Sequence, residues 1–83
     1  MKILYFAWVR QTIGKGEEDF ALPPQVTTVG DLVALLRNRG AGYAEAFGDE
    51  SRIRAALNQE HVHFGARLSD RDELAFFPPV TGG

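Results

Sequence analysis

The C-terminal segment combines the residue types that point most directly to chemistry. Residues 78–83 read PPVTGG, so two prolines precede two glycines, which carry no side chains. The prolines disfavour further sheet pairing and hold the backbone extended, and the glycine pair leaves bare main chain ending in a carboxylate. Such a tail can thread a channel as narrow as a polypeptide backbone and present the carboxylate of Gly83 to another protein's active site. Gly82-Gly83 alone would be typical of a frayed terminus, but here it closely follows a strongly apolar segment, 73–77.

Side chains suited to nucleophilic catalysis are sparse. Without cysteine, the nucleophile would have to be Ser51 or Ser69, and neither lies in a G-x-S-x-G or similar elbow. The pair Gly14 and Gly16 is too short to cradle a phosphate, and no Lys-Ser or Lys-Thr pair follows it. The sequence therefore favours a protein whose own side chains carry out no covalent catalysis.

Two groups of possible metal ligands have simpler interpretations. His61 and His63 are spaced to place two imidazoles on one face of a strand, but a metal site also needs a third ligand and a dry pocket, which so small a core can hardly provide. We interpret them as partly exposed sheet histidines. Asp70, Asp72 and Glu73 resemble a calcium cluster, yet no glycine-centred loop with a terminal glutamate follows. A solvated polar turn is predicted there.

Composition indicates one small globular domain. The 83 residues leave no room for a separate cofactor-binding lobe. Nine basic and eleven acidic residues give a net charge of −2, and the basic residues are scattered, so no nucleic-acid partner is predicted. The absence of cysteine excludes disulfides and fits a reducing compartment. Because no apolar run is long enough for a signal or a membrane span, we expect a cytoplasmic protein with no membrane partner.

Apolar periodicity and turn residues divide the chain into five strands and one main helix. The helix begins at Thr28, whose hydroxyl can cap the backbone N–H of Asp31, and Gly40 is expected to end it in a left-handed conformation. A short helical turn is predicted over 43–47 and a polar turn over 68–72. The predicted strands are 2–9, 17–22, 53–57, 61–64 and 73–77, and the apolar stripe of the helix is Val29, Leu32, Val33, Leu35 and Leu36.

These elements predict an α+β fold of the β-grasp (ubiquitin-like) type. A single amphipathic helix and five strands can share one core if the helix lies across one face of a mixed sheet of about five strands. The first and last strands are the most apolar, so we expect them to pair in parallel at the centre, with segment 17–22 at an edge. Residues 1–77 would then form the domain, and 78–83 a flexible C-terminal tail.

Four segments together resemble one known family over essentially the whole chain. They are KILYFAWVRQ near the start, TVGDLVALL in the helix, AALNQEHV, and FFPPVTGG at the end. They are similar to the MoaD branch of the MoaD/ThiS sulfur carriers, the small subunits of molybdopterin synthases. The PPVTGG ending is the most specific part of the resemblance, and it implies that Gly83 is the working residue.

The resemblance implies a carrier that catalyses nothing itself within a sulfurtransferase complex. An ATP-dependent activating enzyme would adenylate the carboxylate of Gly83, and sulfur would replace AMP to give a thiocarboxylate. The tail, with Gly82 as a threading residue, would then enter the large synthase subunit and donate sulfur to a cyclic pyranopterin precursor, building the molybdopterin dithiolene. Two sulfurs per dithiolene imply two loaded tails and a heterotetramer. No bound cofactor and no metal are implied, since ATP belongs to the activating partner and sulfur is carried covalently.

The expected partner surface is the sheet face opposite the helix. Phe6 and Phe77 would form its centre with His61 nearby, and Leu4 and Trp8 would extend it. The alternative is that these aromatic residues are core packing, as expected for Tyr5, Phe20, Phe47 and Phe76. The tail residues expected to contact partners are Pro78, Pro79, Val80 and Thr81.

Other functions remain compatible with a terminal Gly-Gly. The same chemistry could serve thiamine thiazole synthesis, tRNA thiolation or ubiquitin-like protein modification. A β-grasp adaptor with an incidental tail is the alternative from another class.

Overall fold

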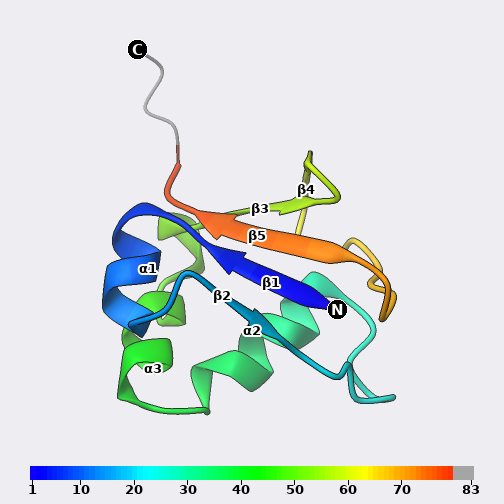
Figure 1. The fold of residues 1–83 in the computed structure, drawn as a ribbon, viewed down its shortest axis with the longest axis horizontal. Coiled ribbons are helices and arrows are strands. Elements are labelled where there is room, and N and C mark those ends of the chain that lie inside the picture. The colour runs from blue at the N-terminus through cyan, green and yellow to red at the C-terminus, as the bar shows by residue number, and fades with distance from the viewer. Residues whose placement is uncertain (80–83) are drawn as a thin grey trace.

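A five-stranded mixed sheet forms the centre of the protein, with all the helices on one side of it (Figure 1). The structure is a computed structural model that describes residues 1–79. The strands are β1 (Lys2–Tyr5), β2 (Glu17–Asp19), β3 (Arg54–Leu57), β4 (Glu60–Val62) and β5 (Glu73–Phe77). The helices are α1 (Ala7–Ile13), α2 (Val29–Arg37), α3 (Ala41–Phe47) and the short 3-10 helix η1 (Glu50–Arg52).

The sheet has the strand order β2-β1-β5-β3-β4. The first and last strands pair in parallel, with Leu4 opposite Ala75, and β3 runs antiparallel to β5 on its other side. β2 lies at one edge, antiparallel to β1. The predicted α+β, β-grasp arrangement is therefore confirmed, including the parallel central pair and the edge position of the second strand.

The first strand is shorter than predicted, and a helix follows it. β1 ends at Tyr5, and Trp8 and Val9, which we expected on the strand, belong to α1. The chain turns at Ala7, which has a positive φ of 54°, and α1 ends at Ile13, with Gly14 as its C-cap at a φ of 95°. α1 packs against α3 and the end of β5, so tertiary contacts stabilise a helix whose aromatic and β-branched residues favour a strand locally.

The main helix begins as predicted and ends differently. The Thr28 hydroxyl accepts a hydrogen bond from the Asp31 backbone N–H at 3.1 Å, and the Asp31 carboxylate accepts one from the Thr28 N–H at 3.2 Å. This reciprocal pair is a capping box. The C-cap is Asn38, with a φ of −95°, and Gly40 instead precedes α3 with a φ of 155° and a ψ of 173°. The expected left-handed stop at Gly40 is therefore wrong.

One side of the sheet and the facing sides of the helices form the core. Tyr5, Phe47 and Phe76 are buried as expected, and the Phe47 and Phe76 rings meet edge to face with centroids 4.9 Å apart. Phe20 is only partly buried, and so is Leu35 on the helix. The buried residues of the α2 stripe are Val29, Leu32, Val33 and Leu36.

Glu18 links the edge strand β2 to the helical layer. Its carboxylate accepts hydrogen bonds from the Tyr5 and Tyr43 hydroxyls, both at 2.7 Å, and from Arg39 Nη1 at 3.0 Å. Burial alone would raise the pKa of Glu18, but these three donors outweigh it and the pKa is lowered. Burial of the Tyr5 hydroxyl, together with the neighbouring Glu18 carboxylate, raises the pKa of Tyr5. The hydroxyl therefore keeps its proton and remains a hydrogen-bond donor.

The β3–β4 connection is a tight hairpin. Asn58 and Gln59 both have positive φ, 50° and 72°, as a two-residue turn of type I′ requires. The Asn58 side chain donates to Asp72 Oδ1 at 2.9 Å and accepts from the Glu73 N–H at 3.0 Å. These bonds attach the hairpin to the start of the central strand β5.

Among residues 1–79, no helix has the length and apolarity needed to cross a bilayer.

Candidate functional site

The sheet side opposite the helices carries an apolar surface. Strand alternation buries Ile3, Tyr5, Leu74 and Phe76 and directs the residues between them outward. Phe6, which directly follows β1, is a large hydrophobic residue that is 48% exposed. We call this surface the docking face, and it consists of Leu4, Phe6, Ala56, His61, Ala75 and Phe77.

The docking face brings Phe6, Phe77 and His61 together from three separate segments. The Phe6 N–H donates to the Phe76 carbonyl at 3.0 Å, which aligns Phe6 beside the end of β5. The His61 ring meets the Phe77 ring edge to face, with centroids 5.1 Å apart. The structure thus groups these three side chains on the helix-free side, as expected.

Trp8 is not part of the docking face. It lies on α1, is partly buried against the core, and has the Arg52 guanidinium over its ring at 4.6 Å. The prediction placed Trp8 on the same strand as Phe6, and it is wrong because the strand ends before residue 7.

The tail begins at the edge of this surface. β5 ends at Phe77, and Pro78 and Pro79 follow with partly buried side chains. Val80, Thr81, Gly82 and Gly83 lie outside the described residues. Because β5 is the central strand and β1 runs parallel to it, the chain leaves the sheet beside Phe6 and the start of α1 (Figure 1).

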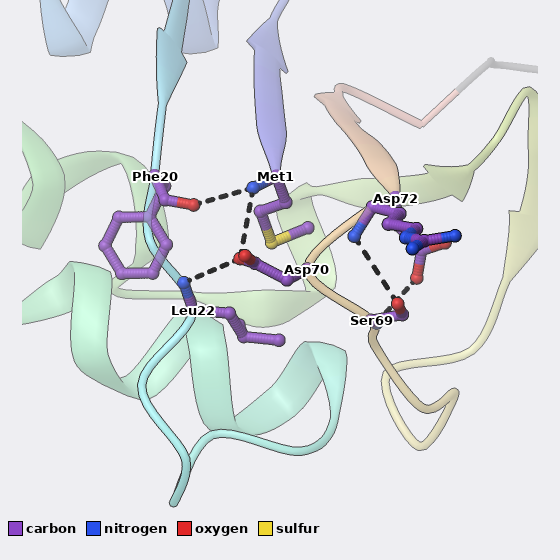
Figure 2. A network of polar contacts seen from close by, with 7 residues as sticks. Met1, Phe20, Leu22, Ser69, Asp70 and Asp72 are labelled. Atoms are coloured by element: carbon purple, nitrogen blue, oxygen red, sulfur yellow. Dashed lines mark hydrogen bonds and ion pairs between the residues drawn. The ribbon is translucent and has the colours of Figure 1, made fainter.

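The acidic segment after residue 68 is a structural turn. Asp70 Oδ1 accepts from the Met1 amino group at 3.3 Å and from the Leu22 N–H at 3.0 Å (Figure 2). The Leu22 N–H and the amino group lower the pKa of Asp70. Asp72 Oδ2 accepts from the Ser69 N–H at 2.7 Å. The predicted polar turn is confirmed, and it joins the first, second and last strands.

Neither the remaining serine nor the histidines form a catalytic or metal constellation. The Ser51 hydroxyl donates to Asp49 Oδ1 at 2.6 Å, at the start of η1. His61 and His63 are both exposed, as expected for sheet histidines. Within residues 1–79, no group of three or more His, Cys, Asp or Glu side chains is arranged to hold a metal ion.

Arg54 lies next to the docking face and is a residue that our sequence reasoning missed. It pairs with Phe77 in the β3–β5 register and lies with His61 and His63 around a hollow of about 280 Å³. The alternation of apolar Ile53, Ala55 and Leu57 was a usable signal, because these residues mark the inward side and leave Arg54 outward.

Comparison with known proteins shows similarity over the full chain. The model of the ThiS family matches residues 3–83. The molybdopterin synthase sulfur carrier subunit of Escherichia coli is 39% identical over 84 residues, covering 100% of this chain and 99% of that protein. The human protein of the same name is 29% identical and likewise covers 100% of this chain and 93% of its own.

Two solved structures resemble the fold as well as the sequence. A putative molybdopterin converting factor, subunit 1, from Pyrococcus furiosus has a TM-score of 0.75 and 33% identity, with 95% of each chain covered. Small archaeal modifier protein 1 from Haloferax volcanii has a TM-score of 0.72 and 28% identity, covering 96% of this chain and 97% of its own.

Proposed function

The chain belongs to the ThiS family, and from this membership we propose that it is the sulfur carrier subunit of a molybdopterin synthase. The observation that carries the proposal is the full-length similarity to proteins of that name in bacteria and eukaryotes. The fold supports it, because the central strand leads directly from the docking face into the PPVTGG segment.

We propose that residues 1–77 form the carrier body and 78–83 the tail that delivers the reactive group. A carboxylate does not react with sulfur nucleophiles because its oxygen is a poor leaving group. In the first step a Gly83 carboxylate oxygen bonds to the α-phosphorus of ATP and pyrophosphate leaves. A sulfide equivalent from a partner then attacks the acyl carbon, and AMP leaves with the bonding electrons. The product is a thiocarboxylate, whose soft sulfur is a nucleophile.

The body supplies docking and no catalytic side chain. Phe6, Phe77 and His61 would contact the large synthase subunit, and Pro78 to Thr81 would guide Gly82 and Gly83 into its active site. Glycine suits the last positions because a chain without Cβ atoms fits a narrow channel. Since a dithiolene contains two sulfurs, we propose a heterotetramer in which two loaded carriers serve a dimer of large subunits. The cysteine-free sequence is consistent with work in the cytoplasm.

Intact mass spectrometry tests the proposal. The chain is incubated with ATP, a molybdopterin synthase activating enzyme and sulfide, and a gain of about 16 Da at Gly83 is expected, because one oxygen is exchanged for sulfur. A variant lacking Gly83 is the matched control and should gain nothing. An unchanged mass, under conditions that load the Escherichia coli carrier, would overturn the proposal.

Protein modification is a second candidate. It is favoured by one observation, the likeness to small archaeal modifier protein 1. A modifier would form amide bonds between Gly83 and lysine side chains, so conjugates of higher mass would accumulate in cells expressing a tagged chain. A carrier that is only a synthase subunit would leave none.

A further inference from the structure

A group of basic side chains lies at one corner of the docking face, around His61. Arg54 lies on β3, His61 on β4 and His63 directly after β4. All three are exposed, whereas Ala55 and Val62, which alternate with them, pack toward the core. Strand alternation therefore directs the guanidinium group and both imidazole rings to the open side of the sheet.

These side chains surround a hollow of about 280 Å³, floored by Ala55 and Val62. Arg54 Nη1 donates to the carbonyls of Ser51 at 3.2 Å and Ile53 at 2.9 Å, and these bonds hold the guanidinium at the rim. A guanidinium has five N–H donors, so the donors on Nε and Nη2 can meet a further acceptor.

The opposite edge of the same face is acidic. Glu17 and Asp19 alternate outward on β2, and Lys2, on the neighbouring β1, lies 3.4 Å from Glu17. The docking face is thus polarised across the sheet, from carboxylates at β2 through apolar residues to basic groups at β3 and β4. A partner that covers this surface would meet negative charge at the β2 edge and positive charge at the β3–β4 edge.

We propose that the large synthase subunit inserts a carboxylate side chain into the hollow between Arg54, His61 and His63, beside its apolar contacts with Phe6 and Phe77. The inference rests on the proposed function, because it takes that subunit as the partner. It adds the chemistry of the partner's surface and the orientation in which it docks.

A carboxylate fits this hollow for geometric and electrostatic reasons. Guanidinium groups bind carboxylates through parallel hydrogen bonds, and such charge-assisted bonds are stronger than neutral ones. The site borders Phe77, so docking of the apolar surface excludes water and strengthens the pair. Arg54 pairs with Phe77 in the β3–β5 register, and the bound carboxylate would therefore fix the partner next to the point where the tail leaves the sheet.

The hollow has charged neighbours on three elements. The charged neighbours are Arg54 on β3, Glu60 on β4, and Glu50 on η1, which lines the adjoining hollow together with His63. The Glu50 carboxylate is already paired with Arg37 at 3.0 Å. Glu50 therefore does not compete with a partner carboxylate for Arg54.

The test is calorimetric titration of the full chain with the large synthase subunit. Arg54→Gln should raise the Kd about tenfold, which is about 1.4 kcal/mol. Arg71→Gln is the matched control, with the same charge change in the exposed turn at the other end of β5, and should change the Kd less than twofold.

Thermal unfolding of each variant separates docking from folding. Arg54 and Arg71 are exposed, so the unfolding midpoints of both variants should stay close to that of the wild type. Normal affinity of Arg54→Gln would overturn the inference and leave the sulfur-carrier function standing. No binding of the wild-type chain to any large synthase subunit would overturn both.

Discussion

Phe76 and Phe77 are neighbours in sequence that β5 directs to opposite sides of the sheet, and replacing each by alanine tests the assignment of the docking face. Phe76 is fully buried, with its ring stacked on Tyr5 at 6.3 Å and meeting Phe47 at 4.9 Å. Phe77 is partly exposed and contacts His61. The first change should therefore damage the fold and the second the binding of the partner.

The expected sizes follow from these environments. Truncating a buried phenylalanine to alanine lowers the free energy of unfolding by about 3–5 kcal/mol. A domain of this length is stable by about 4–12 kcal/mol in total, so Phe76→Ala should remove a large part of it. Truncating the partly exposed Phe77 side chain leaves no enclosed cavity. Phe77→Ala should therefore lower the free energy of unfolding by about 1 kcal/mol, or the unfolding midpoint by about 4–8 °C. As an aromatic anchor of an interface it should contribute about 2 kcal/mol to binding, or about thirtyfold in Kd.

Thermal unfolding by circular dichroism and calorimetric titration with the large synthase subunit measure the two effects separately. We expect Phe77→Ala to unfold cooperatively and bind weakly, and Phe76→Ala to lose most of its stability. If Phe77→Ala destabilised the domain as much as Phe76→Ala, Phe77 would belong to the core. If it bound the partner with unchanged affinity, the docking face would have to lie elsewhere.

Three further predictions concern the elements that hold the docking face in place. Glu18→Gln should lower the free energy of unfolding by about 2–3 kcal/mol at pH 7, because a charged acceptor of three hydrogen bonds is lost. Because the pKa of Glu18 is lowered in the folded state, its stabilising contribution is present above about pH 4.3 and is lost as pH falls through that lowered pKa. In urea unfolding, the difference in free energy of unfolding between the variant and the wild type should therefore narrow between pH 5 and pH 3. A constant difference would contradict this. Gly42→Ala places a Cβ atom 2.7 Å from a backbone oxygen of α1 and should lower the free energy of unfolding by about 1–3 kcal/mol. Gly65→Ala is the control, because a Cβ atom there meets nothing within 4 Å. Equal thermal unfolding midpoints for the two variants would refute the close approach of α3 to α1. Thr28→Ala removes a cap and should cost about 1 kcal/mol, which Thr28→Ser should restore.

Much of the fold could be predicted from local patterns. The capped helix from Thr28 and the apolar strand 73–77 each carry a signal within a few residues, and both are present. The parallel pairing of β1 with β5 followed from their apolar character and from the helix between them. The open side of the sheet with Phe6 and Phe77 followed from strand alternation.

The helix α1 could not be predicted in this way. Segment 2–9 is rich in β-branched and aromatic residues, which favour a strand in isolation. What overrides that preference is distant in sequence, namely the close approach of Gly42 on α3 to the backbone of α1. The error carried over to Trp8, which faces Arg52 and not the docking face.

The sequence by itself indicated the sulfur-carrier chemistry proposed here, because four of its segments resemble the MoaD/ThiS carriers, and that chemistry uses the main chain of residues 82 and 83 and no side chain that the fold would have to position. Only the tertiary structure decided what surrounds the start of that tail. Arg54, His61 and Phe77 come from three strands whose register cannot be read from any one of them, and it is the pairing of β3 with both β4 and β5 that places a basic hollow beside an aromatic surface.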